Sequence, residues 1–545
     1  MSISEATKPV SCRIEPAIPD MLPAALEAYR AGRFDEARQL CLQTLSRNAR
    51  HGAALHLLGM VEFQGRRLEG AEKMLRRALA IEDQNADVLA NLGLILQSRG
   101  KLHEAAACYG QSLRLRPEQI EARNNLGCVY RALNRTDEAE ECFSAVLKRQ
   151  PDFLPALDNL GAVLMHRGAL DEAMDCCRRA LALDPGNPQV QNHAAIVLQY
   201  QGRYAEALAH LDGVCAQLPD ASLPQTPAQA ELRWTRAMMQ LALGDFAAGW
   251  TSYEWRWWSA NFDTPRRNYA QPLWQGEALG EGRLLLWSEQ GVGDEVQFAG
   301  LLPEAIGTGN RILLECAPRL APLLARSFPQ VEVGTQPAVT DFAAHLPLGS
   351  LPGLFRRSEE SFAQTVCGYL KADPAAVERL RARYDDGRRR VGLAWHTTNR
   401  ISGARRSVDL ARFQPLFAQQ NLHWVSLQYG DFDALAKQAA EAGAPLTIDR
   451  AVDQMKDLDL FAAQIAALDL VITIDNSTAH LAAALGRPVW LLLPVASDWR
   501  WMRERDDSPW YPSLRIFRQS RPGDWSDVLL SVTAALEVWR MQDVS

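Results

Sequence analysis

The sequence feature that most limits the possible folds is a spacing of thirty-four residues that recurs through the N-terminal part of the chain. Alanines follow this spacing at Ala37, Ala71, Ala105, Ala139, Ala173 and Ala207. Several of them come directly after a glutamate, as in FDEA, LHEA, TDEA and LDEA. The same step separates Gly59, Gly93, Gly127 and Gly161, and it also separates Pro117, Pro151, Pro185 and Pro219. A fixed period of this length indicates one supersecondary unit repeated along the chain.

We expect each unit to be a pair of antiparallel helices. The small residues would lie where the two helices approach closely, and the prolines would end the second helix. This pattern resembles the tetratricopeptide repeat and covers residues 18–222 in six units. One unit is too small to bury its own apolar face, so the units must stack. The sequence therefore predicts an α-solenoid with a concave groove.

Three asparagines in the repeats go beyond what a repeat needs for packing. Asn91, Asn125 and Asn159 keep the thirty-four-residue step, and each stands directly before Leu-Gly. A side-chain amide both donates and accepts, so such a row can bind the backbone of an extended polypeptide without regard to its sequence. The arrangement resembles the asparagine ladder of O-linked N-acetylglucosamine transferases. Leu57 and His193 occupy this place in the neighbouring units, so a ladder would be short. The alternative is that asparagine is simply tolerated here.

The repeat spacing ends at Pro219, and residues 223–275 are predicted to form an atypical helix pair and a junction. This segment contains Trp250, Trp255, Trp257 and Trp258. The favoured interpretation is that these rings pack the solenoid against the following domain. The alternative is an aromatic surface that binds the face of a sugar.

From residue 276 onward, strand and helix patterns alternate, which predicts an α/β architecture. The strand candidates are RLLLWS at 283–288, RILLE at 311–315, VEVGT at 331–335, RRVGLAW at 389–395, HWVSLQY at 423–429, DLVITID at 469–475 and PVWLLL at 488–493. A polar helix, KADPAAVERLRARYDDGRRR, separates the first three from the rest. We therefore expect two Rossmann-like halves, residues 276–385 and residues 386–545, with a cleft between them.

The richest motif is the run LVITIDNSTAHLAAALGRPVWLLLP at 470–494. A β-branched strand is followed by Asp475, Asn476, Ser477 and Thr478. Asn476 or Ser477 is expected to cap a helix that ends at the Gly-then-Pro sequence of residues 486–488. A helix that starts at the carboxyl end of a strand directs its free N–H groups at the ligand crevice. The motif predicts a phosphate site with His480 as a further donor, and the alternative is an ordinary capped β–α unit.

A second candidate site follows the first strand of the α/β region. Gly291 and Gly293 predict a tight turn, and Asp294 comes directly after it. The third glycine of a dinucleotide motif is absent, and the chain has no Walker A sequence. A carboxylate delivered to the cleft in this way can act as a general base. The alternative is that Asp294 caps the helix that follows.

A loop rich in hydroxyl and basic groups, WHTTNRISGARRSVDL at 395–410, follows the first strand of the second half. Its candidate ligand-binding residues are Thr397, Asn399, Arg405, Arg406 and Ser407. Arginine matches the oxygens of a diphosphate well. The alternative is a solvated basic loop.

Composition limits the partners of the chain. The net charge is −7 and the basic residues are dispersed, so a nucleic-acid-binding face is not expected. The ten cysteines include no CxxC pair and fit buried thiols in a reducing cytoplasm. No apolar run is long enough to span a membrane. The pairs Asp431/Asp433 and Asp457/Asp459 could suggest a divalent-metal site, but such short matches arise easily. Asp457 or Asp459 is instead expected to start the helix LFAAQIAAL, so no metal is expected.

The combination of GVGDEVQF with IDNSTAHLAAALGRP resembles the heptosyltransferase-like group of GT-B glycosyltransferases. The resemblance covers residues 276–540. It implies a nucleotide-sugar substrate held mainly by the C-terminal half, inversion at the anomeric carbon, and no required metal or cofactor. Asp294 matches the catalytic aspartate of the group, and Asn476, Ser477, Thr478 and His480 match its phosphate-binding turn. Arg405 or Arg406 stands near its cationic phosphate contact, where lysine is more usual. Asn476-Ser477 replaces the more typical Thr-Gly.

These observations predict a cytoplasmic glycosyltransferase that modifies Ser or Thr hydroxyls of a protein recruited by the repeats. Bacterial flagellin glycosyltransferases combine similar repeats with such a domain, so flagellin is the favoured acceptor by resemblance. One alternative is heptosyltransferase-like transfer to lipopolysaccharide, and another is a non-catalytic repeat scaffold. The late segment SDWRWMRERDDSPWYPS at 497–513 is predicted either to shape a sugar or nucleobase pocket or to pack the cleft rim.

Overall fold

The computed structural model describes residues 21–218, 226–335, 341–399 and 403–542. The chain divides after Leu183 into two compact units. The predicted domain boundaries at residues 18 and 222 lie outside the described residues, and the predicted boundaries within the α/β region stay predictions.

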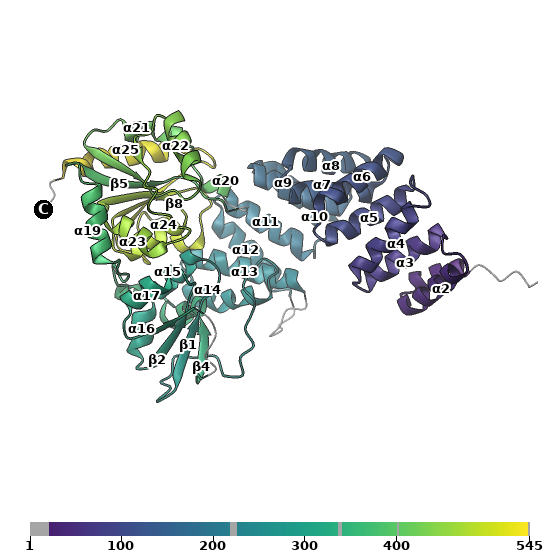
Figure 1. Ribbon diagram of the computed structural model, residues 1–545, viewed down its shortest axis with the longest axis horizontal. Helices are drawn as coiled ribbons and strands as arrows, with labels where there is room; N and C mark the ends of the chain where they lie inside the picture. The colour runs from purple at the N-terminus through teal and green to yellow at the C-terminus, as the bar shows by residue number, and fades with distance from the viewer. Residues whose placement is uncertain (1–20, 219–225, 336–340, 400–402, 543–545) are drawn as a thin grey trace, which may run out of the picture. The chain divides into compact units, whose positions relative to one another are not determined.

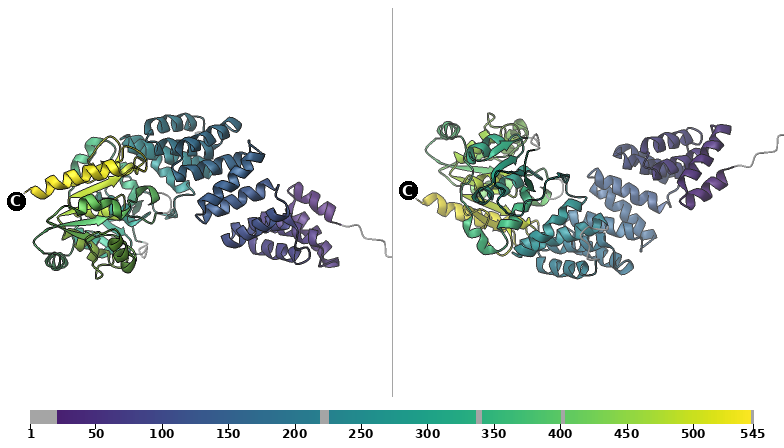
Figure 2. Two further views of the ribbon diagram at one scale, coloured as in Figure 1. Left: turned by 90° about the horizontal axis from the view of Figure 1, so that it is seen from above. Right: turned by 90° about the horizontal axis from the view of Figure 1, so that it is seen from below.

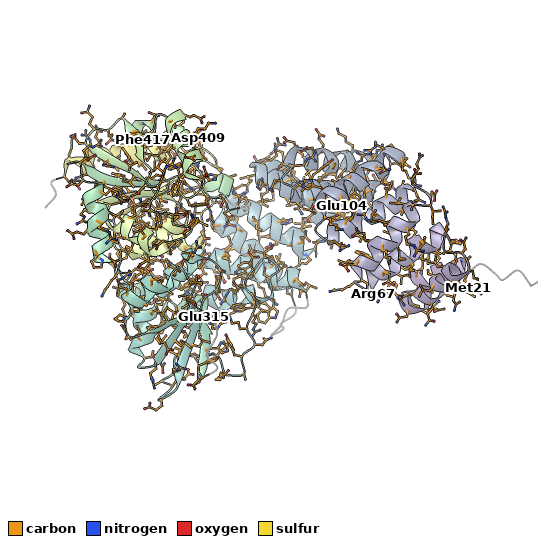
Figure 3. The ribbon with its side chains drawn as sticks, viewed as in Figure 1. Met21, Arg67, Glu104, Glu315, Asp409 and Phe417 are labelled. Atoms are coloured by element: carbon orange, nitrogen blue, oxygen red, sulfur yellow. The ribbon has the colours of Figure 1, made fainter. Side chains whose placement is uncertain are left out.

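The first unit is built from helices that follow one another as antiparallel pairs, which Figure 2 shows in purple to blue. The helices are α1 Leu22–Arg30, α2 Phe34–Arg47, α3 Gly52–Gln64, α4 Leu68–Leu79, α5 Ala86–Ser98, α6 Leu102–Leu115, α7 Ile120–Ala132, α8 Thr136–Arg149, α9 Leu154–Arg167 and α10 Leu170–Leu183. Ion pairs join neighbouring repeats, such as Arg76 to Glu104 at 2.6 Å, and Figure 3 labels this glutamate.

The repeated small residues lie where the sequence predicts them. The six alanines of the thirty-four-residue series have no exposed surface. The glycines face the second helix of their own repeat, where Gly59 meets Leu75 and Gly127 meets Phe143. The repeat prediction is therefore confirmed by the packing, because a larger side chain at these positions would separate the paired helices.

Gly127→Ala should destabilise the first unit because a Cβ at this position would lie only 2.6 Å from Cε1 of Phe143. We expect a loss of ~1–3 kcal/mol from overpacking. Gly110→Ala is the matched control, since it also lies inside a helix but its Cβ would meet nothing closer than 3.7 Å. The control should gain ~0.5–1 kcal/mol from helix propensity. Urea unfolding followed by circular dichroism measures both, and equal stability of the two variants would contradict the packing described.

The second unit begins with helices that continue the repeats. They are α11 Pro188–Tyr200, α12 Tyr204–Cys215, α13 Pro227–Ala242, α14 Phe246–Tyr253 and the 3-10 helix η1 Glu254–Trp258. Trp250 on α14 is 4% exposed and contacts Trp499 and Trp510 edge to face at ring-centroid distances of 5.1 and 6.2 Å. The packing role predicted for this tryptophan is confirmed.

The first sheet of the α/β region, in teal in Figure 1, has the parallel strand order β3-β2-β1-β4 among the described residues. Its strands are β1 Arg283–Trp287, β2 Arg311–Glu315, β3 Glu332–Gly334 and β4 Ala344–Pro347. Its helices are α15 Val292–Ala299, α16 Leu302–Gly307, α17 Ala321–Ser327, α18 Leu351–Phe355, η2 Leu348–Ser350 and η3 Glu359–Gln364. The linking helix α19 Pro374–Arg383 follows as the sequence predicts.

The second sheet has the parallel order β10-β9-β8-β5-β6-β7 among the described residues. Its strands are β5 Arg389–Ala394, β6 Leu422–Ser426, β7 Leu446–Thr447, β8 Leu470–Ile474, β9 Val489–Leu493 and β10 Leu514–Arg518. Its helices are α20 Gly403–Arg406, α21 Gln414–Phe417, α22 Phe432–Glu441, α23 Leu458–Ala466, α24 Ser477–Ala484, α25 Ser526–Met541, η4 Leu410–Phe413 and η5 Trp499–Trp501. Asp457 caps α23, which confirms the predicted helix start, and Asp431 caps α22.

The predicted strands are all present, and β4, β7 and β10 are additional. The fold is therefore a helical repeat solenoid followed by an α/β region with parallel sheets, as predicted. One continuous apolar core contains side chains of α11 to α14 and of both sheets. None of the helices within the described residues is both long and apolar enough to cross a membrane.

Candidate functional site

A cavity of about 450 Å³ is lined by residues of both sheet-bearing halves. The lining residues are Gln290, Val292, Gly293, Asp294, Arg319, Thr397, Thr398, Asn399, Arg406, Tyr429, Gln454, Met455, Leu458, Asp475, Asn476, Ser477, His480, Asp498 and Arg500. Helix α15 of the first half packs against helix α24 of the second. This contact brings the start of each helix to the same cavity.

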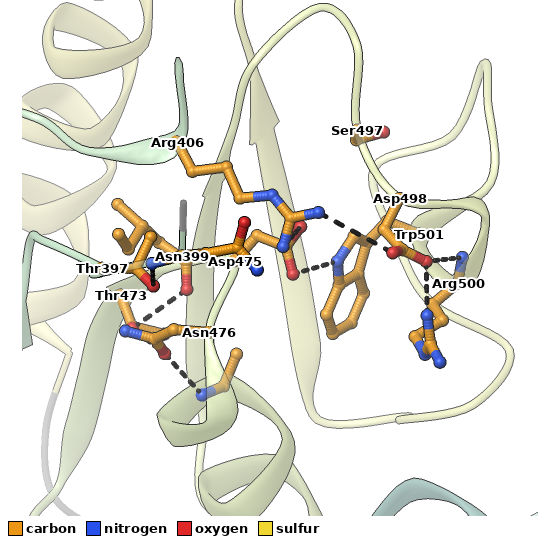
Figure 4. A network of polar contacts seen from close by, with 12 residues as sticks. Thr397, Asn399, Arg406, Thr473, Asp475, Asn476, Ser497, Asp498, Arg500 and Trp501 are labelled. Atoms are coloured by element: carbon orange, nitrogen blue, oxygen red, sulfur yellow. Dashed lines mark hydrogen bonds and ion pairs between the residues drawn. The ribbon is translucent and has the colours of Figure 1, made fainter. Parts of the chain in front are cut away.

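Asn476 forms the N-cap of α24, directly after the buried strand β8. Its Oδ1 accepts hydrogen bonds from the Ala479 N–H at 3.3 Å and from the Thr473 hydroxyl at 3.1 Å, as Figure 4 shows. Its buried Nδ2 has no hydrogen-bond partner among the described residues. The turn thus leaves an amide donor and the first N–H groups of a helix at the cavity, which suits an anionic ligand.

The close approach of Gly293 to His480 explains why α15 begins with a glycine turn. A Cβ on Gly293 would lie 3.1 Å from Cδ2 of His480. His480 is held by the Tyr511 hydroxyl, 2.9 Å from its Nδ1, and by the Trp501 ring at a centroid distance of 4.9 Å. Burial lowers the pKa of His480 to about 3, with Arg500 and Arg406 acting in the same direction. The imidazole is therefore neutral near pH 7 and serves the cavity as a polar, uncharged group.

Carboxylates and guanidiniums alternate along the cavity wall. Arg500 bonds Asp294 and also pairs with Asp498 at 2.8 Å. Arg406 pairs with Asp475 at 3.0 Å and faces Asp498 at 3.8 Å, as Figure 4 shows. Asp475 also accepts a hydrogen bond from the Trp501 indole at 2.8 Å. These contacts hold each charged side chain in a fixed position.

The protonation of these carboxyls is set by burial and by the arginines. Burial raises the pKa of Asp294 above its usual value, although Arg500 opposes the shift. Burial likewise raises the pKa of Asp475 against the attraction of Arg406. For Asp498, burial acts upward but Arg500 and Arg406 outweigh it, so its pKa lies below the usual value. Asp294 therefore has the higher proton affinity expected of a general base.

Arg319 approaches the cavity from the segment between β2 and α17. Within the described part of the chain it makes no hydrogen bond or ion pair, although its charge lowers the pKa of Glu295 against the effect of burial, whereas Arg406 and Arg500 are both paired. An unpaired guanidinium at a concave site favours an anionic ligand. Among the described residues, no group of three His, Cys, Asp or Glu side chains could hold a metal ion.

The structure brings most of the predicted site residues to the cavity. Those that line it are Gly293, Asp294, Thr397, Asn399, Arg406, Asp475, Asn476, Ser477 and His480. Gly291 instead caps α15, and its N–H donates to Asp294 at 3.0 Å. Ser407 accepts a hydrogen bond from the Thr397 N–H at 3.1 Å, and Thr478 is buried. Residue 400 of the same loop lies outside the described residues.

Arg405 turns away from the cavity toward the last predicted repeat. Its guanidinium lies 3.7 Å from the centre of the Tyr200 ring and donates to the Tyr200 hydroxyl at 2.5 Å. Tyr204 donates to the Ser497 carbonyl at 3.0 Å. The end of the repeats therefore holds both loops that carry Arg406 and Asp498.

The three repeat asparagines are partly buried on the first helices of their repeats. Asn91 lies 2.7 Å from Nε2 of His56, and Asn159 donates to Asn124 at 3.5 Å. Their predicted role in acceptor binding stays a prediction.

Sequence reasoning missed Arg319, Tyr429, Gln454 and the individual roles of Asp498 and Arg500. The sequence predicts that the segment 497–513 either shapes a pocket or packs the cleft rim, and Asp498 and Arg500 belong to it. The sequence signal for a functional role was the close spacing of charged residues and tryptophans in this segment. Arg319 follows a proline and belongs to no recognisable sequence motif, so its sequence context offered no reason to place it in a site.

Glu295, next to Asp294 on α15, provides a pH-dependent test of this environment. It is 5% exposed, accepts a hydrogen bond from the Ala317 N–H at 2.9 Å, and has a pKa raised by burial to about 7. Because the folded pKa exceeds the unfolded one, its contribution to stability is fully present below about pH 4.5 and is lost as the pH rises through 7. Glu295→Gln should therefore be more stable than the parent by ~1–3 kcal/mol at pH 8.

The advantage of Glu295→Gln should shrink toward pH 5, where the parent residue is mostly neutral in the folded state. Denaturant unfolding at pH 5 and pH 8 measures both values. Glu332→Gln, which removes an exposed carboxyl on β3, is the control. A Glu295→Gln advantage that is equal at the two pH values would contradict burial as its cause.

Comparison with known proteins locates the repeats. Tetratricopeptide-repeat models match residues 22–86 and 124–188, residues 84–152, and residues 164–232. Protein FlbA of Caulobacter vibrioides is 33% identical over 333 residues, which is 56% of this chain and 55% of FlbA. The chain thus spans about half the length of this curated relative.

Solved structures resemble part of the chain. They include Pseudomonas aeruginosa pilF, at 18% identity and TM-score 0.34 over 37% of this chain and 91% of pilF. A tetratricopeptide repeat protein of Parabacteroides merdae has 21% identity and TM-score 0.37 over 43% of this chain and 90% of its own. YrrB, described as a repeat protein with an unusual peptide-binding site, has 20% identity and TM-score 0.30 over 33% of this chain and 93% of its own. With the family-model matches and the helical pairs described above, the N-terminal part of this chain is a tetratricopeptide-repeat solenoid.

Proposed function

We propose that the protein is a GT-B glycosyltransferase that moves a sugar from a nucleotide sugar to a Ser or Thr hydroxyl of a protein. One observation carries the proposal: Asp294 and the start of α24 line the same cavity. The donor's phosphate would bind the N–H groups at Ser477 and the amide of Asn476. Arg319 and Arg406 would balance its charge.

In the proposed reaction, Asp294 takes the proton of the acceptor hydroxyl while that oxygen attacks the anomeric carbon. The bond from this carbon to the phosphate oxygen breaks, and the departing nucleotide keeps the electron pair. Attack opposite the leaving group inverts the anomeric configuration. The helix terminus and the two arginines stabilise the charge that develops on the leaving phosphate. The nucleotide sugar is a substrate, and the proposal includes no metal or cofactor.

The repeats would supply the acceptor, because tetratricopeptide solenoids present a concave protein-binding surface. In this proposal, the side-chain amides of Asn91, Asn125 and Asn159 bind the acceptor protein. Flagellin is the acceptor favoured by resemblance to repeat-bearing flagellin glycosyltransferases. The sugar transfer would take place in the cytoplasm, where nucleotide sugars are made.

Thermal-shift screening of the full chain against UDP-, GDP- and CMP-sugars tests donor binding. A ligand bound only by the native state stabilises it by RT ln(1 + [L]/Kd), so a donor at a hundred times its Kd adds ~2.7 kcal/mol. Intact-mass spectrometry then follows flagellin incubated with the protein and the selected donor. A mass gain of one sugar residue that appears only when both the protein and the selected donor are present supports the proposal. Absence of any nucleotide-sugar binding would contradict it and favour a scaffold.

A further inference from the structure

A second cavity, of about 610 Å³, lies apart from the first and shares no lining residue with it among the described residues. It is formed by η1, the segment of residues 266–275, and the β1 and β4 strands. This volume is within the ~300–1,000 Å³ typical of small-molecule sites. The proposed glycosyl transfer makes no use of it.

Aromatic side chains line the wall of this cavity. They include Trp257 and Trp258 on η1, Tyr269, and Trp287 at the end of β1, whose ring is 2% exposed and lies 4.7 Å from the Arg267 guanidinium. The indole N–H of Trp257 donates to Glu254 at 3.1 Å, and that of Trp287 donates to His345 at 3.2 Å. Burial lowers the pKa of His345, which keeps its ring neutral and able to accept this bond. The rings are therefore held in fixed orientations before any ligand arrives.

A buried arginine beneath the wall explains this rigidity. Arg256 has no exposed surface and donates to Glu289 at 3.0 and 3.1 Å, to Glu254 at 2.9 Å and to Ser350 at 2.9 Å. Its guanidinium also lies 4.5 Å from the ring centre of Trp257. The η1 segment is thus tied both to the segment after β1 and to the segment after β4. Such preorganisation lowers the ordering cost of binding.

Polar groups surround the aromatic wall. Arg357 makes no hydrogen bond or ion pair with another residue in the described ranges. Arg266 lies 5.1 Å above the Trp258 ring and is otherwise exposed, and Asn268 is exposed beside it. The side chain of Glu254 is 45% exposed although it is paired with Arg256. The rim therefore offers both donors and acceptors.

We propose that this second cavity binds carbohydrate. A pyranose has an apolar C–H face that packs on an indole ring and a circle of hydroxyls that both donate and accept. A purely apolar ligand would desolvate the charged rim without compensation, and a simple anion would not use the aromatic wall. The mixed lining matches a sugar better than either. The inference does not depend on the proposed function, since a non-catalytic scaffold could also bind a glycan.

The test uses saturation-transfer NMR and calorimetry on the full chain with methyl β-D-glucoside, N-acetylglucosamine and glucuronate as separate probes. Trp258→Ala removes one aromatic ring, and because Trp258 is only partly buried, the fold should persist. Arg357→Gln removes the unpaired cation. Trp539→Ala, a partly buried tryptophan on α25, is the matched control.

We expect at least one probe to bind at millimolar concentration, with binding at least about tenfold weaker in Trp258→Ala and in Arg357→Gln. Trp539→Ala should bind like the parent, and Arg319→Gln, in the first cavity, should also retain this binding. Two outcomes would overturn the inference: no probe binds at 20 mM, or binding is unaffected by Trp258→Ala. Neither of these outcomes changes the donor-binding result that tests the proposed function.

Discussion

Replacing Asp294 with asparagine should lower turnover by ~10²- to 10⁴-fold, the usual cost of losing a positioned base. Asparagine keeps an oxygen that can accept the hydrogen bond from the Gly291 N–H, so α15 should still begin at the same place. An amide cannot take the proton of the acceptor hydroxyl. Arg500 keeps its pair with Asp498, and the start of α24 is unchanged. We therefore expect donor affinity within a few-fold of the parent.

Asp498→Asn is the matched control for this experiment. It also removes a carboxylate bonded to Arg500 in the same cavity, but Asp498 lies between two guanidiniums that hold its pKa low. A base of this kind would take a proton poorly, so its loss should reduce turnover much less than the loss of Asp294. Initial rates of nucleotide release measure both variants. If Asp294→Asn works at the parental rate, Asp294 is not the base.

Arg256→Met should destabilise the second unit by ~3–5 kcal/mol, the cost of leaving a buried charge without its partner. Both Arg256 and Glu289 have fully buried side chains, and the arginine joins Glu289, Glu254 and Ser350. Methionine fills much of the volume but leaves the Glu289 carboxylate unpaired. A Cβ on Gly349 would lie 1.8 Å from Oε1 of Glu289, so the carboxylate has no room to move toward this glycine.

The double variant Arg256→Met/Glu289→Gln separates charge from packing. Removing both partners should restore part of the lost stability, because replacing a whole buried ion pair costs less than breaking it. Guanidinium unfolding followed by tryptophan fluorescence gives the free energies of unfolding. If the double variant is no more stable than Arg256→Met, the loss comes from packing and not from the unpaired carboxylate.

The repeats could be predicted from sequence because their packing depends on residues close along the chain. The close approach of Gly93 to Tyr109 recurs with the same spacing at Gly127 and Phe143. The buried central strands could be predicted from apolar runs such as VITI before Asp475. Two of the three missed strands lacked this signal: Ala344–Pro347 contains a histidine and a proline, and Leu446–Thr447 has two residues.

The parts of the site that depend on residues close along the chain could be predicted from the sequence. A cap at Asn476 or Ser477 follows from polar residues between a strand and a helix, and the structure places it at Asn476. The direction of Arg405 was not predictable, because its partner Tyr200 lies on a helix about two hundred residues earlier in the chain. The bond of Arg500 to Asp294 likewise joins segments whose proximity only the tertiary fold determines.

The most direct test of the central claim compares donor binding by the parent and by Asn476→Asp. Aspartate is as good an N-cap as asparagine, so α24 should still form. It replaces the buried, unpaired Nδ2 with a second carboxylate oxygen and places a negative charge where the phosphate should bind. Thermal-shift titration with the selected nucleotide sugar should raise the Tm of the parent and leave that of Asn476→Asp unchanged. An equal rise in both proteins would contradict phosphate binding at the start of α24.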